Sequence, residues 1–194
     1  MILMVVVSCD YSGELEQLKR NMKPCEDEYF LRIASTVATT SNCIRRKYGA
    51  VIVEKDKISA KQQYEFGRIV GYGSNQATLT STSCNVTGTC WRMENNIPHG
   101  KMYEMCKSVH AEQNAIISSE LTDLSECVLY LVGYDCTEQN FIEAEPCYIC
   151  AKMLYSMGLR FVITMDSSKG ARRGSILLSL DNIIKKHENS VKDE

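Results

Sequence analysis

The chain has 194 residues, which is enough for one domain with a substantial hydrophobic core. Hydrophobic residues make up 44% and charged residues 24%, a balance typical of a soluble globular protein rather than of a disordered or membrane protein. The formal net charge of -2 and the shortness of the basic runs argue against tight binding of a nucleic-acid backbone, so a small ligand is the better expectation.

The N-terminal residues 1–7 are apolar, but no basic segment precedes them and Asp10 and Glu14 follow soon after. Such a run is too short to span a bilayer, and it makes a poor signal peptide. We expect a buried strand or a packed terminal arm here, no membrane partner, and a cytoplasmic location.

Local patterns predict helices and strands in alternation along the first half of the chain. Apolar residues at helical spacing predict a helix at 27–38, and β-branched runs predict strands at 50–53 and 68–72 with a polar turn between them. Residues 74–107 are rich in Ser, Thr, Asn, Gly and Cys and show little periodicity. A loop of that length inside a compact domain needs a functional or metal-held explanation.

The second half continues the alternation. It predicts, in chain order, a helix at 109–119, a strand at 127–132, a loop at 139–145, a helix at 147–157 closed by Gly158, a strand at 161–165 and a helix at 176–187. The order α, β, β, α, β, α, β, α indicates a sheet covered by helices on both faces.

Ten cysteines are a high count for a chain without an export signal, and in a reducing compartment clustered cysteines more often bind metal than form disulfides. The strongest motif combines His110-Ala111-Glu112 with the pentapeptide at 146–150 (PCYIC), each at the start of a predicted helix. An H-x-E segment followed by P-C-x-x-C is the signature of zinc-dependent deaminases.

The chemistry of these residue types supports a catalytic zinc. Cys147 and Cys150 are one helical turn apart, so both sulfurs face the same side, and Pro146 suits the first turn of a helix. A helix N-terminus lowers a thiol pKa and so favours the thiolate that binds zinc. With His110 as third ligand, one tetrahedral position stays open for water, and zinc lowers the pKa of that water towards neutrality.

Glu112 is expected to act as the general acid and base. Two residues after His110 on a helix, it faces another side and is poorly placed to share the metal. Its carboxylate can take the proton of the water and deliver it to the ring and then to the departing ammonia, as hydroxide adds to C4 of cytosine. The competing interpretation is a closed structural zinc with Cys136 as fourth ligand.

The chain resembles the deoxycytidylate (dCMP) deaminase family, within the cytidine deaminase-like fold, over roughly residues 27–165. The resemblance rests on these segments: 27–30 (DEYF), 41–53 (SNCIRRKYGAVIV), 90–92 (CWR), 96–98 (NIP), 103–116 (YEMCKSVHAEQNAI) and 145–158 (EPCYICAKMLYSMG).

The resemblance implies an α/β protein with a three-layer α/β/α sandwich around a five-stranded mixed sheet. It implies free dCMP as substrate, dUMP as product, a homo-oligomer (dimer or hexamer), and dCTP and dTTP as effectors. We therefore expect an N-terminal extension at 1–26, a zinc-dependent nucleotide deaminase domain at 27–187 and a charged tail at 188–194.

The segment after the second predicted strand departs from the family pattern. The family usually has Gly-Tyr-Asn-Gly where this chain has Gly73-Ser74-Asn75-Gln76, so substrate choice and allosteric control are both in doubt. Asn75 keeps the matching amide and is expected to contact the sugar or base of the substrate, and Ala111 is expected to contact the substrate as well.

Cysteines outside the motif suggest a second metal site. Similar dCMP deaminases hold a structural zinc with cysteines that match Cys43 and Cys84, and Cys90 and Cys106 could complete four thiolates around it. Such a site would order the long loop. The alternatives are that these are small buried side chains or that His99 replaces one ligand. The other cysteines, Cys9, Cys25, Cys127 and Cys136, are expected to be inert.

Three other functions remain open at this point. The same metal site would serve a deaminase that acts on dCTP or another free nucleotide, or one that acts on nucleic acid, although the acidic balance disfavours a polymer. A non-catalytic zinc-bound interaction module is the third. The presence of Glu112 argues against it, because loss of this acid is the simplest way to abolish the chemistry.

Overall fold

The computed structural model describes residues 5–7, 26–55, 67–78, 81–98, 101–167 and 174–192. Residues 5–7 and 190–192 are described by their backbone alone. Most of the expected N-terminal extension, the turn after residue 55, His99, Cys9 and Cys25 lie outside the described residues. Within these ranges no helix has the length and apolar character needed to cross a bilayer.

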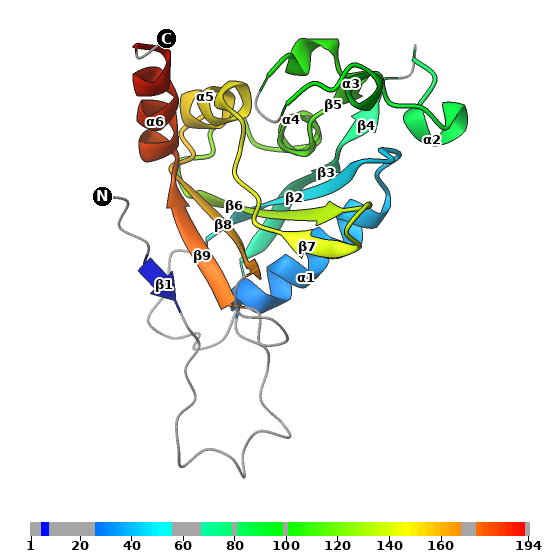
Figure 1. Ribbon diagram of the computed structural model, residues 1–194. Helices are drawn as coiled ribbons and strands as arrows, with labels where there is room; N and C mark the ends of the chain where they lie inside the picture. The colour runs from blue at the N-terminus through cyan, green and yellow to red at the C-terminus, as the bar shows by residue number, and fades with distance from the viewer. Residues whose placement is uncertain are drawn as a thin grey trace, which may run out of the picture.

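A mixed sheet forms the centre of the protein (Figure 1). Its strand order is β1 (Val5–Val7), β9 (Gly174–Ser179), β8 (Phe161–Asp166), β6 (Cys127–Asp135), β2 (Arg46–Glu54) and β3 (Arg68–Ser74), and β7 (Asn140–Ile142) pairs with the end of β6. β6 and β8 run parallel, whereas the other pairs are antiparallel. The five longer strands are the five-stranded mixed sheet that the resemblance implied, and β1 and β7 are short additions.

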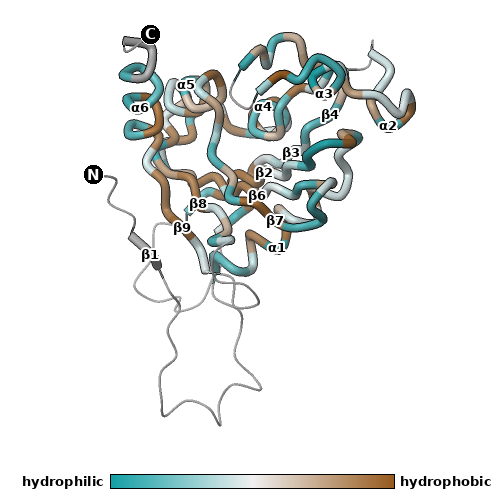
Figure 2. The backbone as a smooth tube through the Cα atoms, viewed as in Figure 1, coloured by the Kyte–Doolittle hydropathy of each residue, from teal (hydrophilic) through white to brown (hydrophobic). Residues whose placement is uncertain are grey.

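Helices cover both faces of the sheet, which confirms the three-layer α/β/α sandwich. α1 (Glu26–Thr39) packs on one face, and α4 (Ala111–Ile117), α5 (Tyr148–Ser156) and α6 (Leu180–Lys192) lie on the other (Figure 1). Alternate residues of β2 point to opposite faces, so Val51 and Val53 pack towards α1 while Ala50 and Ile52 join the core beneath α4 and α5. Hydrophobic residues accordingly concentrate along the central strands (Figure 2).

The main difference from the sequence expectation concerns residues 176–187. We expected one helix there, but the chain forms strand β9 first and α6 begins only at Leu180. Ile176 and Leu178 are buried in the core next to β8. Periodicity alone cannot separate a short apolar strand from a buried helical turn. Pairing with the edge of β8 makes residues 174–179 a strand.

Two other segments contain short elements where we expected loops. The region 74–107 carries β4 (Gln76–Ala77), α2 (Cys84–Thr87), α3 (Trp91–Glu94) and a 3-10 turn (Tyr103–Met105), and β4 pairs with β5 (Ser108–Val109). The expected loop at 139–145 contains β7. The expected helix at 109–119 begins at Ala111, because Val109 is taken up by the pairing with β4.

The close approach of α4 to β3 depends on a missing side chain at Gly73. A Cβ atom at this position would lie 2.6 Å from the backbone nitrogen of Ala115 and 2.6 Å from the Cβ of Asn114. The first of these atoms is helix backbone and cannot give way as a flexible side chain does. Gly73 thus sets how near α4, which begins after His110, lies to the sheet.

We predict that Gly73→Ala destabilises the protein by about 1–3 kcal/mol, the usual cost of overpacking a close-packed contact. The free energy of unfolding, measured by urea denaturation, should fall by this amount. An unchanged unfolding midpoint would mean that α4 can move away from β3 without cost, and would contradict the role given to this glycine.

Candidate active site

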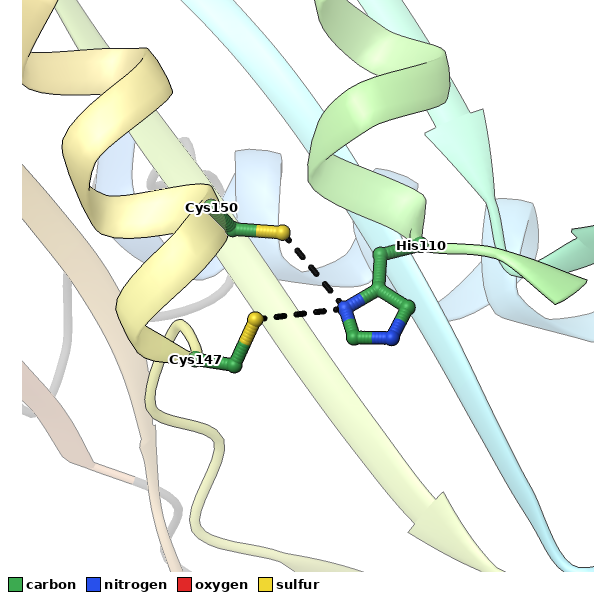
Figure 3. Close-up of side chains that lie close together, drawn as sticks. All are labelled: His110, Cys147 and Cys150. Carbon is green, nitrogen blue, oxygen red and sulfur yellow. Dashed lines mark hydrogen bonds between the residues drawn. The ribbon is translucent and has the colours of Figure 1, made fainter. Parts of the chain in front are cut away.

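Two helix N-termini meet above the sheet and bring the motif residues together (Figure 3). His110 is the residue immediately before α4, and Cys147 is the residue immediately before α5. Both have extended backbone conformations, with φ and ψ of -69° and 155° for His110 and -66° and 162° for Cys147. Cys150 lies in the first turn of α5 and is buried. The three side chains therefore converge from two elements far apart in sequence.

Donor atoms of His110, Cys147 and Cys150 all lie within 4.8 Å of one another. The Nδ1 atom of His110 is 3.4 Å from the sulfur of Cys147 and 3.5 Å from the sulfur of Cys150 (Figure 3). Zinc bonds of about 2.3 Å to sulfur and about 2.0–2.1 Å to nitrogen, at tetrahedral angles, separate the two donors by about 3.5 Å. One nitrogen and two sulfurs at these distances fit a zinc ion.

The charge states of the two thiols differ. The pKa of Cys147 is lowered to about 4, chiefly because it accepts a hydrogen bond from Cys150, with a further contribution from His110. The pKa of Cys150 is raised for the same reason, since its thiol holds the shared proton. Burial lowers the pKa of His110, but its hydrogen bond to Cys147 and the nearby carboxylate of Glu112 outweigh burial and raise it. These shifts favour the thiolate form of Cys147, which is the form that binds zinc.

Glu112 lies beside the three donors without belonging to their group. Its side chain is buried, at 6% exposure, in the first turn of α4. Burial raises its pKa to about 7, against the opposing effects of the His110 charge and a hydrogen bond from Cys150. Among the described residues, no fourth His, Cys, Asp or Glu joins the three donors. The arrangement of three ligands with a separate carboxylate is that of an open site.

One pocket collects most of the residues that the sequence singled out. Its lining combines the metal-ligand candidates His110 and Cys147, the carboxylate of Glu112, and both expected substrate contacts, Asn75 and Ala111. Aromatic and basic side chains complete the wall: Tyr48, Tyr103, Arg45, Arg46 and Arg92. A flat heterocycle with an anionic substituent matches this mixture of aromatic and basic groups.

The family model described as "Cytidine and deoxycytidylate deaminase zinc-binding region" matches residues 24–166, more than half of the chain. The chain belongs to the cytidine and deoxycytidylate deaminase family. The match includes the segment around Asn75 and both metal-ligand motifs, so the resemblance inferred from the sequence is confirmed.

Relatives within the family differ in how much of their length this chain covers. The deoxycytidylate deaminase of Mycobacterium phage D29 is 33% identical over 146 residues, which are 73% of this chain and 94% of the phage protein. That of Schizosaccharomyces pombe is 27% identical over 142 residues, 73% of this chain but 37% of the yeast protein. The solved dCMP deaminase of cyanophage S-TIM5 in its apo form is 20% identical, with a TM-score of 0.49, and the match covers 85% of this chain and 94% of that chain.

Asn75, in the segment that departs from the family pattern, is engaged mostly with the protein itself. Its Oδ1 atom accepts hydrogen bonds from the backbone N–H of Tyr48 and from the hydroxyl of Ser41, each at 2.7 Å. Its Nδ2 atom donates to the carbonyl of Arg46 at 2.9 Å. Asn75 therefore holds the start of β2 in place, and with it two side chains of the pocket wall. One Nδ2 hydrogen remains for another partner.

The four cysteines expected to form a second site lie near one another but are not at ligand distances. Burial raises the pKa of Cys84, and the charges of Cys90, Cys43 and Cys106 raise it further, so all four sulfurs share one neighbourhood. In the part of the chain that the structure describes, however, no three of these sulfurs lie within 4.8 Å of one another. Cys136 contacts the carbonyl of Cys43 at 4.0 Å and does not join the His110 cluster.

Sequence reasoning gave no role to several residues of the pocket wall. Tyr48, Tyr103 and Arg92 all lie in segments that carry the family resemblance, which is the signal that could have found them. Tyr103 packs edge-on against His110, with ring centroids 5.0 Å apart. The guanidinium of Arg92 lies over the Tyr103 ring, 4.5 Å from its centroid. A run of contacts thus connects α3 to the metal-ligand candidates.

We predict that Cys147→Ser lowers the zinc content of the purified protein by about one ion per chain, because a serine hydroxyl is a poor substitute for a thiolate ligand. The measurement is elemental analysis by mass spectrometry. Cys127→Ser is the matched control, since Cys127 is buried in β6 away from the cluster and should leave the zinc content unchanged. Equal zinc in both variants would contradict the assignment of the cluster.

Proposed function

We propose that the protein hydrolyses the amino group of dCMP to give dUMP and ammonia. The observation that supports this most directly is the buried carboxylate of Glu112 beside three zinc-binding donors in one pocket. The phage relative named deoxycytidylate deaminase, of which the chain covers 94%, supports dCMP over other cytosine nucleotides.

His110, Cys147 and Cys150 would hold a zinc ion. A zinc ion in such a site supplies a nucleophilic water whose pKa is lowered towards neutrality. Cys150 is buried and His110 and Cys147 are half-buried, so bulk solvent reaches the three donors only in part. The first turns of α4 and α5 contribute backbone N–H groups and the positive ends of two helix dipoles, which stabilise negative charge between them.

Glu112 would carry the protons. Its carboxylate takes a proton from the attacking water, whose oxygen bonds to C4 of the cytosine ring, and passes that proton to N3 of the ring. A second proton from the water reaches the exocyclic amino group by the same carboxylate. The C4–N bond then breaks, ammonia leaves, and a C4 carbonyl remains. A pKa of about 7 suits this role, because the group both accepts and donates near neutral pH.

The pocket wall would hold the nucleotide. The backbone N–H of Ala111, in the first turn of α4, has no helical carbonyl to bond and can donate to a base carbonyl. The free Nδ2 hydrogen of Asn75 can reach a sugar oxygen or base acceptor. Tyr48 and Tyr103 provide aromatic surfaces for the base or sugar.

We also propose a second, structural zinc bound by Cys43, Cys84, Cys90 and Cys106. The influence of the charges of Cys90, Cys43 and Cys106 on the pKa of Cys84 supports a common site. Four thiolates around one ion form a closed tetrahedral site. It would order the region 74–107, whose elements are too short to be stable alone.

Four broader expectations stay predictions: the cytoplasmic location, a homo-oligomer, control by dCTP and dTTP, and the division into segments 1–26, 27–187 and 188–194. The substrate can be tested by ammonia release from CMP, dCMP, dCTP, cytidine, dAMP and a cytosine-containing oligonucleotide. The highest kcat/KM should be for dCMP. Preference for dCTP or for the oligonucleotide would replace the proposed substrate, and release from none would favour an interaction module.

We predict that Glu112→Gln lowers kcat on dCMP by roughly 10²–10⁴-fold, the range lost with a general acid and base. Zinc content should stay at the wild-type value, because Glu112 is not among the ligand candidates. Glu120→Gln is the control, since this exposed carboxylate pairs with Arg68 at the surface. Turnover within a few fold of wild type in Glu112→Gln would exclude the proton-transfer role.

We predict about two zinc ions per wild-type chain and a loss of one in Cys84→Ser, together with a lower thermal unfolding temperature. Elemental analysis and calorimetry on the same preparations give both values. Cys136→Ser should keep both ions, although its sulfur lies next to Cys43. A wild-type content of one ion, lost in Cys147→Ser but retained in Cys84→Ser, would rule out the second site.

A further inference from the structure

Arg92, on the short helix α3, is a buried cation with unused hydrogen-bonding capacity. The residue is 5% exposed, and its Nη1 atom has no hydrogen-bond partner among the described residues. Its Nη2 atom donates to the carbonyl of Pro98 at 2.9 Å, and its planar group lies over the Tyr103 ring. Buried polar groups are nearly always paired, so an unpaired guanidinium nitrogen calls for a specific explanation.

The pocket supplies that explanation. Arg92 lines the same pocket as His110 and Glu112, and its Nη1 atom is shielded from bulk water. The Tyr103 ring beneath its guanidinium packs in turn against His110. An anion bound in this pocket would lie beside Arg92.

Two other charged side chains of the pocket wall are compensated locally. Arg46 pairs with Asp135 at 3.0 Å, and Glu145 pairs with Lys186 at 3.1 Å. Arg92 has no carboxylate partner in the part of the chain that the structure describes. A buried charge without a counter-ion is costly, and an anionic ligand would remove that cost.

We infer that Arg92 binds the phosphate of the substrate nucleotide and is the residue that makes the enzyme prefer a nucleotide to a nucleoside. This inference rests on the proposed function, since it assigns the anionic part of that substrate. A guanidinium presents its donors in a fixed fork that matches phosphate oxygens, and charge-assisted hydrogen bonds of this kind are the strong ones. The contacts with Tyr103 and Pro98 fix the plane of the group before the ligand arrives.

Steady-state kinetics on dCMP and deoxycytidine tests the inference. Arg92→Gln should lower kcat/KM on dCMP by roughly 10–150-fold, the factor that corresponds to one charged hydrogen bond, and change kcat/KM on deoxycytidine by less than about threefold. Arg92→Lys keeps the charge but loses the fork, so its effect on dCMP should be intermediate. Zinc content and thermal unfolding are measured on each variant to detect a structural effect.

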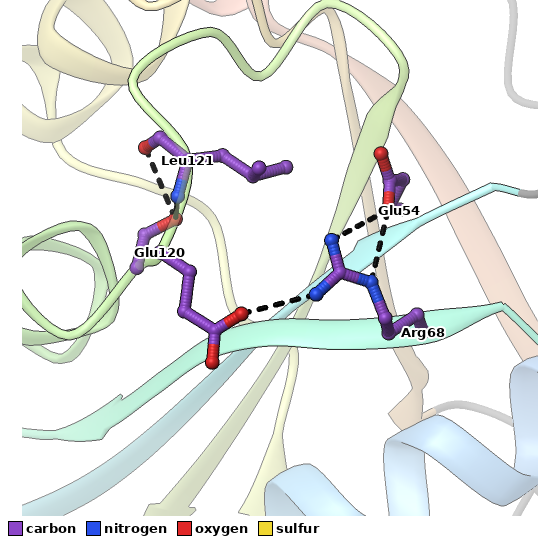
Figure 4. A network of polar contacts seen from close by, with 5 residues as sticks. Glu54, Arg68, Glu120 and Leu121 are labelled. Atoms are coloured by element: carbon purple, nitrogen blue, oxygen red, sulfur yellow. Dashed lines mark hydrogen bonds and ion pairs between the residues drawn. The ribbon is translucent and has the colours of Figure 1, made fainter.

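Arg68→Gln is the matched control. Arg68 lies at the start of β3, at the opposite end of that strand from Asn75, and pairs with Glu54 and Glu120 at the surface (Figure 4). Exposed ion pairs of this kind contribute little to stability, so both substrates should be processed as by the wild type.

A second measurement separates failure of this inference from failure of the proposed function. Trp91 is the only tryptophan in the chain and adjoins Arg92, so its fluorescence reports binding of dUMP and of deoxyuridine without any turnover. If the wild type deaminates neither substrate, the proposed function fails. Tighter binding of dUMP than of deoxyuridine, lost in Arg92→Gln, would still support the phosphate contact.

Two outcomes overturn the inference. The first is an equal loss of kcat/KM on dCMP and deoxycytidine in Arg92→Gln, with lower stability or lost zinc, which would make Arg92 a structural support for the segment that contains Pro98. The second is unchanged affinity for dUMP in Arg92→Gln.

Discussion

The meeting of two helix N-termini is the constraint on which the rest of this protein depends. α4 and α5 bring an imidazole and two sulfurs within 4.8 Å, although His110 and Cys147 lie 37 residues apart. Neither helix is long enough to hold such an arrangement by itself, so the sheet beneath them has to fix both. Gly73 lets α4 settle closely on β3, and Ala151 and Leu154 anchor α5 in the core.

The same geometry governs the electrostatics of the site. Helix N-termini favour negative charge, and Cys147 carries the thiolate of the pair with a pKa of about 4. Glu112, buried in the first turn of α4, has the opposite shift because burial disfavours its charged form. The pKa values of Cys147 and Glu112 are thus shifted in opposite directions within one pocket. A lowered thiol pKa suits a metal ligand, and a raised carboxyl pKa suits a group that accepts and donates protons.

Residues 74–107, here called the cap, form part of the pocket wall. It contributes Asn75, Arg92 and Tyr103, and it contains three of the four cysteines proposed for a structural zinc. A segment made of such short helices and strands gains little stability from its own core. Metal binding and the contacts between Arg92, Tyr103 and His110 would couple the order of this cap to the chemistry beneath it.

The candidate site could be predicted from local sequence patterns. The H-x-E and P-C-x-x-C motifs predict the three metal-ligand candidates and the carboxylate of the site. Helical spacing predicts that Cys147 and Cys150 lie on one side of a turn. Both predictions succeed from sequence because ligand chemistry and helix geometry are local properties. Much of the alternation of helices and strands was also predictable. The periodic segment 27–38 forms helix α1, and the apolar runs form strands β2, β6 and β8.

Other features depend on contacts between segments that are far apart in the sequence. Strand β9 forms where we expected part of a helix, because it pairs with the edge of β8. The sequence pattern of residues 176–187 contains no information about that edge. Asn75 proved to be tied to the backbone of β2, and Arg92 to be buried with an unpaired nitrogen. The pairing of β9, the hydrogen bonds of Asn75 and the burial of Arg92 all depend on which atoms of distant segments come into contact. Such contacts are set by close packing of the whole domain, and no single residue type predicts them.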